Sequence, residues 1–590
     1  MADPFSIAAG AIGVVSLSLQ LLGGCIKGFV ILSAAHSHEK DAATIVCMLN
    51  LQEIQLVEWA RRAGLLTGQG LLDRRINANA VEETLLQLQT LLTDTKKLKK
   101  RYGLDVQVVT SSASMPQDTG NGISVNTGVS DTIRNSILAR SKVNQSYNVL
   151  QRFWWATVDK EKIEKLVADI HFLVRELWHL LDPWRQDDMI ASTQSIAAGM
   201  ISLNERFDQL TFLNEALAAS RSYVSRDVSR GDVDGLATSA KIKAYRVGLE
   251  QIYERPFIER ESNLPSQQKL LGGLENLSTG KLGDFKPIDR SKTMGMSTYD
   301  DQIVFVEEKQ LGPPMPQKSL IRAKTLAVLL NVSKSRTFGS LQCRGIIEDR
   351  DKVKFVFHHP YPDSKEHQPR SLLELLHHRD GIKPPSLTER IKLALQVACL
   401  VQNFHRAGWL HKSLRSENVL FFRSNDDISL RARLVEPVLA GFAFSRQDSP
   451  TEISEQPSAD PRNDIYRHPS ALGEPTTSFT ADMDIYSLGV ILLEIAEWRA
   501  LRHLVDSVVD SNVETVPLNK IGEVRAFLIA GKGKGGTSRL QERMGDIYAS
   551  ATRMCLKGEV SDMNDAQGGV HSTGLSLLGA VVQRLNMCRV

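Results

Sequence analysis

Residue types that could take part in catalysis gather in two short stretches of the second half of the chain. The first stretch contains His411, Ser413 and Asn418, and the second contains Gly441 and Phe442. A general base has to take up a proton near the working pH, which a serine hydroxyl at neutral pH does not do. A glycine offers no side chain to a metal ion. The two stretches therefore carry an imidazole, a hydroxyl and an amide, without a carboxylate at Ser413 or Gly441.

The first stretch resembles the protein-kinase catalytic loop, whose motif is H-R-D-L-x-x-x-N. The resemblance places His411 at the motif's His and Asn418 at its metal-binding Asn. It places Ser413 at the catalytic Asp, which accepts the proton of the substrate hydroxyl and positions the nucleophile. General-base assistance of this kind is worth about 10²–10⁴-fold in rate.

The second stretch resembles the kinase segment that carries D-F-G. Gly441 stands at the Asp that binds Mg²⁺, and Phe442 stands at the Phe. Loss of both acidic positions is hard to reconcile with phosphoryl transfer. The resemblance therefore implies a pseudokinase rather than an enzyme, and we expect no cofactor.

Other parts of the kinase pattern are only partly present. Asp484, Ser487 and Gly489 match the helix that anchors the catalytic loop in kinases. A glycine-rich phosphate loop is missing, and the nearest candidate for the ATP-pairing lysine is Lys309. The helix expected between residues 319 and 330 shows no acidic partner for that lysine. ATP binding is therefore doubtful, although the sequence leaves it open.

Hydrophobic periodicity predicts an α+β domain in the second half of the chain. Strand patterns at 303–306 and 353–357 precede helical patterns at 370–378, 386–407 and 482–497. This order fits a two-lobed, protein-kinase-like domain over residues 261–590. The Gly-, Ser- and Lys-rich residues 262–300 are interpreted as a linker or an irregular edge of the first lobe.

The first half predicts an all-α helical bundle over residues 1–200, followed by a helical brace and linker over 201–260. Apolar faces of helical period recur between residues 45 and 59, 81 and 92, and 163 and 181. The Ser/Thr/Gly/Asn-rich stretch 110–131 is interpreted as a mobile loop.

Composition limits the remaining functional classes. The formal net charge of +3 gives no general attraction to nucleic acid. Six scattered cysteines and the histidine pairs at 358–359 and 377–378 lack metal-ligand spacing, so we expect a reduced cytosolic protein and no metal site. The acidic start, Met-Ala-Asp-Pro, argues against a secretory signal peptide.

Residues 1–15 resemble the opening of the HeLo domain, an all-α module of fungal heterokaryon-incompatibility and prion-inhibition and propagation proteins. Residues 153–160, which read Phe-Trp-Trp-Ala-Thr-Val-Asp-Lys, are a second match. Together with the pseudokinase half, the arrangement resembles the mixed-lineage kinase domain-like protein of animals. The resemblance implies regulated programmed cell death by membrane permeabilisation. The chain would be cytoplasmic at rest and, once an unknown upstream protein activates it, a homo-oligomer contacting lipids of the plasma membrane.

A segment that could enter a membrane lies at the N-terminus. Residues 4–26 carry no charge, although serines, a glutamine and glycines dilute the run, and Gly24 and Gly28 are spaced for close helix contact. The sequence leaves open whether this segment inserts into a bilayer or is a buried bundle helix. Its candidate inserting residues are Phe5, Ile7, Ile12, Val14, Val15, Leu17, Leu19, Leu21 and Leu22.

A basic run follows the second helical pattern and is either a lipid contact or a solvated helix end. It consists of Lys96, Lys97, Lys99, Lys100 and Arg101.

Two other functions of the chain stay open at this point. One is a non-toxic signalling scaffold that uses both halves only to bind partners, and the other is an atypical active protein kinase.

Overall fold

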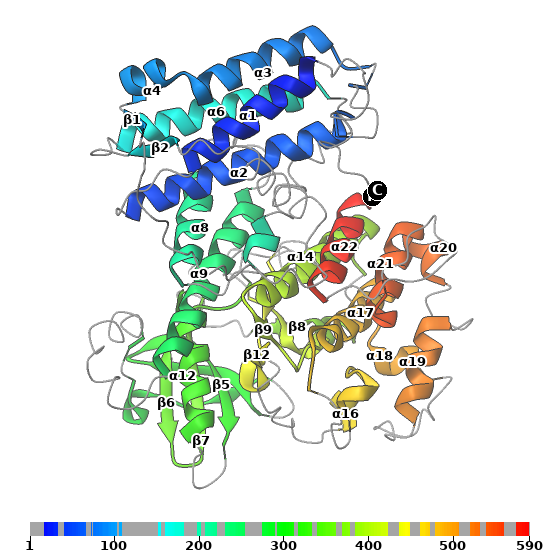
Figure 1. The fold of residues 1–590 in the computed structure, drawn as a ribbon. Coiled ribbons are helices and arrows are strands. Elements are labelled where there is room, and N and C mark those ends of the chain that lie inside the picture. The colour runs from blue at the N-terminus through cyan, green and yellow to red at the C-terminus, as the bar shows by residue number, and fades with distance from the viewer. Residues whose placement is uncertain are drawn as a thin grey trace. The chain divides into compact units, whose positions relative to one another are not determined.

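The computed structural model divides the chain into two compact units, residues 1–237 and 238–590 (Figure 1). The predicted brace of residues 201–260 is shared between them. The described residues are 17–33, 40–66, 72–73, 75–102, 105–108, 151–154, 160–181, 197–201, 207–220, 230–253, 274–275, 277–288, 292–311, 317–332, 339–361, 369–377, 384–422, 436–448, 461–472, 478–506, 520–530, 539–559 and 574–588.

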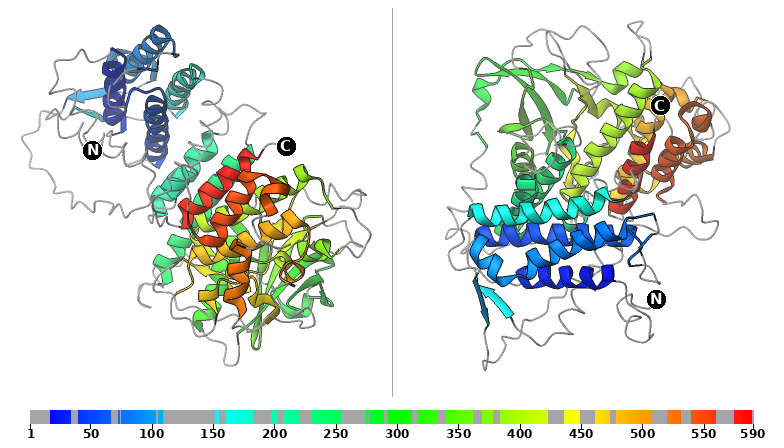
Figure 2. Two further views of the ribbon diagram at one scale, coloured as in Figure 1. Left: turned by 90° about the vertical axis from the view of Figure 1, so that its right-hand side faces the viewer. Right: turned by 90° about the horizontal axis from the view of Figure 1, so that it is seen from above.

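The N-terminal unit is built on four long helices that pack side by side (Figure 2). Helix α1 packs on α3 and α2, and α6 packs on the same two helices, which closes a four-helix bundle. Two flanking helices and a two-stranded antiparallel ribbon complete the unit. The elements are α1 (Leu17–Ser33), α2 (Lys40–Arg62), α3 (Ala78–Thr93), α4 (Thr95–Tyr102), β1 (Asp105–Val108), β2 (Gln151–Trp154), α6 (Lys160–His179) and α8 (Phe207–Ser220).

Helix α3 shows how the sequence produces this bundle. Asn77 caps its N-terminus by accepting a hydrogen bond from the Ala80 main-chain nitrogen at 3.3 Å, which satisfies one of the free N–H groups of the first turn. Its apolar residues recur at helical spacing and lie on one buried face. They are Val81, Leu85, Leu88 and Leu92, all fully buried.

Where the structure describes the uncharged N-terminal segment, it forms the first part of α1 and is partly buried in the bundle. Leu21 and Leu22 of α1 are buried in the bundle, whereas Leu17 at the start of the helix is exposed. The candidate inserting residues from Phe5 to Val15 lie outside the described residues, as does the predicted loop 110–131. Among the helices of the described ranges, none combines the length and the hydropathy needed to cross a bilayer.

Helix α1 approaches α3 closely because two of its residues lack a side chain. A Cβ added to Gly28 would lie 2.5 Å from the Cβ of Leu92, and one added to Gly24 would lie 2.2 Å from the Gln89 amide. Cys25, between the two glycines, donates to the main-chain oxygen of Leu85 at 3.4 Å. The glycine spacing seen in the sequence thus serves a helix contact inside the bundle.

The C-terminal unit starts within helix α9 (Arg230–Tyr253) and contains a five-stranded antiparallel sheet of order β3-β4-β5-β7-β6. Its strands are β3 (Lys286–Pro287), β4 (Met294–Tyr299), β5 (Gln302–Gln310), β6 (Cys343–Asp349) and β7 (Lys352–His358). The prediction of a linker or irregular edge is wrong for residues 294–299, which form a regular strand. Their alternation was hard to read because Met294, Gly295 and Ser297 are poor strand signals.

Helix α12 (Gln317–Val332) packs on β6 and β7 of this sheet. The predicted helix at 370–378 starts later than expected, because Arg370–Ser371 form strand β8 and only Leu372–Leu376 form helix α13. A capping box between Ser371 and Glu374 fixes that start. The predicted helices 386–407 and 482–497 are observed as α14 (Leu387–Arg406) and α17 (Ala481–Glu497).

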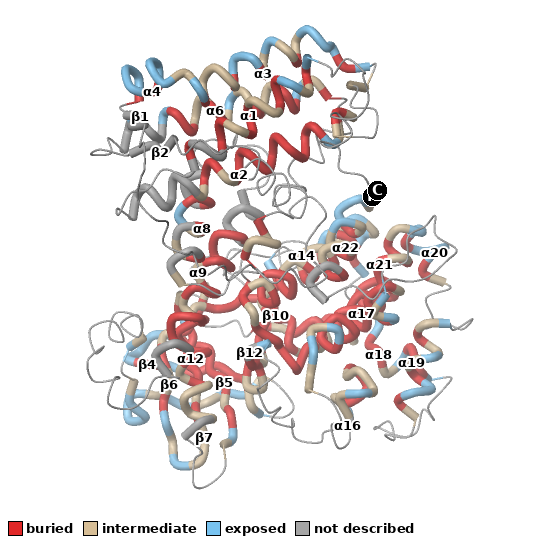
Figure 3. Tube along the Cα trace, in the orientation of Figure 1, coloured by how far each residue is buried: buried red, intermediate tan, exposed pale blue. Residues whose placement is uncertain are grey.

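The rest of the unit is mostly helical around α17. Figure 3 shows α17 buried along its length, and every residue from Met483 to Glu497 is buried. Helix α21 (Asp546–Lys557) packs on α17, and α22 (Gly574–Met587) packs on α21 and α14. Gly489 permits the first contact, since a Cβ there would lie 2.7 Å from the Cβ of Cys555. One continuous apolar core joins the sheet to these helices.

The α1–α3 contact predicts opposite effects for the same substitution at two glycines. Gly28→Ala would lower the free energy of unfolding of the N-terminal unit by about 1–3 kcal/mol, because its methyl group overlaps Leu92. A Cβ added at Gly23 meets no atom within 4 Å. Gly23→Ala would therefore raise the free energy of unfolding by about 0.5–1 kcal/mol, because alanine has the better helix propensity. Scanning calorimetry of the full chain measures both. Equal effects of the two substitutions would contradict this account of the contact.

Candidate functional site

The residues of the kinase-like stretch lie on a short turn between small strands. Strand β9 (Trp409–Leu410) leads into the turn, a 3₁₀ segment η4 (Ser416–Asn418) follows, and β10 (Val419–Phe421) leaves it. Strand β10 pairs with β8 and with β11 (Val438–Leu439), so its two neighbours fix where Asn418 lies. The structure therefore brings His411, Ser413, Asn418 and Gly441 into one site, as their resemblance to the two kinase motifs implied.

Asp484 holds this turn from α17. Its carboxylate accepts hydrogen bonds from the main-chain nitrogens of His411 at 2.6 Å and Lys412 at 2.9 Å, and from Nε2 of His405 at 3.1 Å. The side chain is fully buried. Burial alone would raise the pKa of Asp484, but the hydrogen bonds from His405 and His411 outweigh it and lower the pKa. A buried charge is thus kept by three donors.

The neighbouring anchor residues act on a second segment. Ser487 donates to the main-chain oxygen of Tyr466 at 2.9 Å, which ties the segment around residue 466 to α17. Gly489 serves the α17–α21 packing instead, because a Cβ there would lie 2.7 Å from the Cβ of Cys555.

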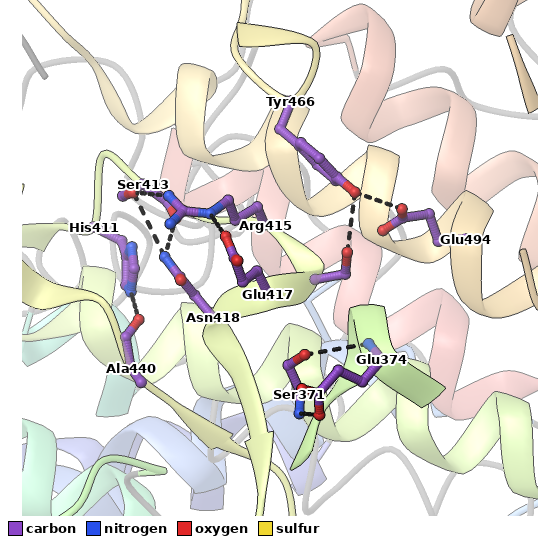
Figure 4. Close-up of polar contacts among 11 residues, drawn as sticks. Ser371, Glu374, His411, Ser413, Arg415, Glu417, Asn418, Ala440, Tyr466 and Glu494 are labelled. Atoms are coloured by element: carbon purple, nitrogen blue, oxygen red, sulfur yellow. Dashed lines mark hydrogen bonds and ion pairs between the residues drawn. The ribbon is translucent and has the colours of Figure 1, made fainter. Parts of the chain in front are cut away.

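His411 is a neutral, structural imidazole. Burial lowers its pKa to about 4, so the ring carries no charge at neutral pH. Its Nε2 lies 3.0 Å from the carbonyl oxygen of Ala440, and a carbonyl can only accept, so Nε2 carries the proton (Figure 4). The ring packs against Phe442, with 5.1 Å between centroids, and against Phe404 at 6.0 Å.

The hydroxyl and the carbonyl oxygen of Ser413 are both hydrogen-bonded to neighbouring side chains. Its Oγ accepts a hydrogen bond from Nη1 of Arg415 at 2.7 Å, and its carbonyl oxygen accepts one from Nδ2 of Asn418 at 2.6 Å (Figure 4). Arg415 also donates to Glu417 at 3.0 Å. The position that carries a base in kinases is here a buried hydroxyl hydrogen-bonded to a guanidinium.

Gly441 adopts a conformation that side chains disfavour. Its φ of 81° and ψ of 39° lie in the left-handed region. A Cβ at this position would lie 2.3 Å from Nδ2 of Asn418. An aspartate therefore does not fit at Gly441 without a shift of Asn418 and of the backbone.

A carboxylate that the sequence analysis did not single out faces this glycine. Glu307 of β5 accepts hydrogen bonds from the main-chain nitrogens of Gly441 and Phe442, both at 2.9 Å. It is 2% exposed. Strand alternation could have identified it, because Glu307 lies two residues after Phe305 and shares the inward face of an apolar strand.

Lys309 lies on the same strand, two residues beyond Glu307, and is also buried. In kinases the third strand carries the ATP-pairing lysine, which forms an ion pair with a glutamate of the following helix. Here β5 is the third strand, and α12, the following helix, contains no acidic residue at all. Lys309 therefore has no glutamate on α12 with which to form that ion pair.

A buried series of hydrogen bonds also links the turn to Glu494 of α17. Ser416 Oγ lies 3.0 Å from the hydroxyl of Tyr466, which donates to Glu494 at 2.7 Å (Figure 4). Glu494 also accepts from the main-chain nitrogen of Leu501 at 2.7 Å. Burial raises the pKa of Glu494 to about 7, although these hydrogen bonds oppose the shift.

The second candidate surface, in the N-terminal unit, is helix α4. All five basic residues predicted as a lipid contact are exposed on it. Arg101 forms an ion pair with Asp169 of α6 at 3.0 Å, and Asp94 caps the helix through the main-chain nitrogens of Lys96 and Lys97.

Over the described part of the chain, no group of three or more His, Cys, Asp or Glu residues is placed to hold a metal ion.

Two family models match the chain. Residues 10–213 match the family described as prion-inhibition and propagation, the HeLo family. Residues 333–560 match a family described as a domain of unknown function, DUF7580. The first match covers most of the helical N-terminal unit. The second covers most of the C-terminal unit, including the part of the candidate site from His411 to Asp484 but not Glu307 or Lys309.

Two curated plant proteins are similar to part of the chain. A serine/threonine-protein kinase-like protein of Arabidopsis thaliana is 32% identical over 199 residues, which are 33% of this chain and 52% of that protein. Protein STRUBBELIG-RECEPTOR FAMILY 5, also of Arabidopsis thaliana, is 32% identical over 133 residues, 22% of this chain and 16% of that protein. The chain thus spans about half of the first relative and a smaller part of the second.

The raised pKa of Glu494 predicts a pH-dependent contribution to stability. The folded state holds the Glu494 proton up to about pH 7, whereas the unfolded state releases it near 4.5. The stabilisation is therefore complete below about pH 4.5 and is lost as pH rises toward 7. Relative to Glu494→Gln, which cannot ionise, the native chain would lose roughly 2–3 kcal/mol between pH 5 and 8.

Urea unfolding of the C-terminal unit at four pH values between 5 and 8 measures this difference. Glu523→Gln, which removes an exposed carboxylate on α19 (Ile521–Ala530), controls for the loss of one charge. Parallel pH profiles of the native chain and Glu494→Gln would contradict the assignment.

Proposed function

We propose that the chain is a latent effector of cell death or heterokaryon incompatibility. Its helical N-terminal unit acts on membranes, and its C-terminal unit is a catalytically inactive, two-lobed kinase-like domain that restrains it. The observation that carries this proposal is the occurrence of two features in one chain. One is the prion-inhibition and propagation match, and the other is a kinase-like site with Ser413 and Gly441 at its acidic positions.

Catalytic inactivity is supported by the surroundings of the two positions. Ser413 is bound by Arg415, and the space beside Gly441 is taken by Asn418. The carboxylate nearest to the main chain of Gly441 comes from Glu307, whose oxygens accept two N–H groups. Ser413 and Glu307 thus both accept hydrogen bonds from neighbouring groups of the chain, and neither is placed as a general base for a substrate hydroxyl.

Membrane action is supported by the N-terminal segment and by α4. Residues 4–26 carry no charge, and the part seen in α1 is held in the bundle by α3. Release from α3 would expose an apolar helix, with Lys27 near its end able to reach the headgroups at modest cost. The exposed cations of α4 would add about 1 kcal/mol each against an anionic surface.

In this proposal the protein rests in the cytoplasm and binds lipids of the plasma membrane as a homo-oligomer after activation by an upstream protein. Neither nucleic acid nor a metal takes part. Lipid headgroups and apolar chains are the ligands that α4 and the N-terminal segment fit by charge and hydropathy.

Expression of residues 1–237 alone tests the membrane activity. We expect loss of membrane integrity and growth arrest, because the restraining unit is missing, and rescue by Ile12→Glu with Val15→Glu, which place charges in the uncharged segment. Dye release from liposomes with and without anionic lipid gives the matching measurement in vitro. A folded, soluble fragment that leaves cells and liposomes intact would favour the scaffold function instead.

Incubation of the full chain with radiolabelled ATP and Mg²⁺ tests the inactivity. We expect no transfer of the γ-phosphoryl group to the chain itself or to generic protein substrates. Transfer that depends on Mg²⁺ and persists after repurification would identify an atypical active kinase.

A further inference from the structure

A cavity of about 130 Å³ lies beside the C-terminal end of α21. The described residues that line it are Ser550, Arg553, Met554, Lys557 and Glu559. The first four stand at i, i+3, i+4 and i+7, so they share one face of the helix. None of the lining residues belongs to the kinase-like turn.

The end of α21 brings a carboxylate to the same cavity. Gly558 is left-handed, with φ 78°, and its main-chain nitrogen donates to the carbonyl oxygen of Met554 at 2.9 Å. This is the usual way in which a glycine ends a helix. Glu559 follows directly, so one carboxylate lines the cavity together with the two cations on the helix face.

The opposite charges of the cavity are held apart. In the part of the chain that the structure describes, neither Arg553 nor Lys557 forms an ion pair or a side-chain hydrogen bond with Glu559. A molecule that neutralised all three groups would therefore have to carry a negative and a positive charge of its own.

The hydroxyl of Ser550 is also available. A helical serine or threonine commonly donates to the carbonyl oxygen four residues earlier, as Thr552 does to Tyr548 at 3.0 Å. Among the described residues, Ser550 makes no such bond. Its hydroxyl can therefore donate into the cavity, on the same side as Arg553.

We propose that this cavity binds a small phosphate ester that also carries an amine, as the phosphoethanolamine group does. Arg553, Lys557 and Ser550 bind the phosphate, and Glu559 binds the ammonium group. This inference concerns the C-terminal unit alone, and it stands whether or not the N-terminal unit acts on membranes.

The donors of the cavity match the acceptors of a phosphate. A guanidinium binds two phosphate oxygens at once, whereas a lysine ammonium group acts as a compact point charge. The Ser550 hydroxyl supplies a further donor for the remaining oxygen. Arg584 of α22 contacts Sδ of Met554, which adds positive charge next to the cavity.

The ammonium group is favoured by charge and by size. Glu559 and the C-terminal end of the α21 dipole are both negative, and they lie at the same end of the cavity. One water needs roughly 10–15 Å³, so a cavity of about 130 Å³ has room for about ten non-hydrogen atoms. Phosphoethanolamine fits within that limit.

Titration calorimetry of the full chain with O-phosphoethanolamine tests the proposal. Arg553→Gln should weaken binding at least tenfold, because the guanidinium that holds two phosphate oxygens is lost. Lys557→Gln changes an exposed position, should weaken binding at least threefold, and decides the matter if Arg553→Gln does not fold. The matched control is Lys392→Gln, which removes an exposed cation of α14 outside the cavity and should leave the affinity unchanged.

Inorganic phosphate and L-glutamate serve as comparison ligands. The native chain should bind O-phosphoethanolamine at least threefold more tightly than either of them. Glu559→Gln should abolish the preference over inorganic phosphate, because the partner of the ammonium group is lost. Tighter binding of L-glutamate, or a preference that persists in Glu559→Gln, would overturn the assignment.

Cosedimentation with vesicles separates a lipid headgroup from a soluble metabolite. Vesicles of phosphatidylcholine with phosphatidylethanolamine are compared with vesicles of phosphatidylcholine alone. Retention that needs phosphatidylethanolamine and is lost in Arg553→Gln identifies a lipid, whereas binding of the soluble ester without such retention identifies a metabolite. The proposal fails if neither form binds, or if the native chain and Arg553→Gln bind both forms equally.

Discussion

The order of the candidate site depends on one buried carboxylate. Asp484 accepts two main-chain N–H groups of the turn at His411 and Lys412, and the hydrogen bonds from His405 and from the main chain of His411 keep its pKa low despite burial. With this turn fixed, the His411 ring reaches Ala440, and Ala440 sets the start of the left-handed turn at Gly441. Removal of the donors would leave an uncompensated buried charge, which typically costs several kcal/mol. The turn and α17 are therefore mutually dependent.

The hydrophobic periodicity of the sequence predicted most of the helices and several of the strands. The bundle helices and the strands at 303–306 and 353–357 could be predicted because their apolar periods are uninterrupted. Strand β4 was missed because Gly295 weakens its strand pattern, and pairing with β5 along its whole length supplies what its own sequence lacks. Boundaries set by caps, such as the Ser371 start of α13, follow from side-chain geometry that periodicity does not contain.

The candidate site was predictable where it rests on spacing and unpredictable where it rests on pairing across the sequence. The resemblance of two short stretches to kinase motifs was enough to group His411, Ser413, Asn418 and Gly441. The role of Glu307 depends on a contact 134 residues away, and no local pattern reports such a partner. The pKa of Glu494 is likewise set by the burial of this α17 side chain beside Tyr466, which is a property of the folded unit.

The left-handed turn at Gly441 also limits how the sequence can change. An acidic residue at this position would need a different backbone angle, a displaced Asn418 and a second carboxylate beside Glu307. The residue type at 441 is therefore structurally coupled to the side chains at 418 and 307, two positions that lie 23 and 134 residues away along the chain.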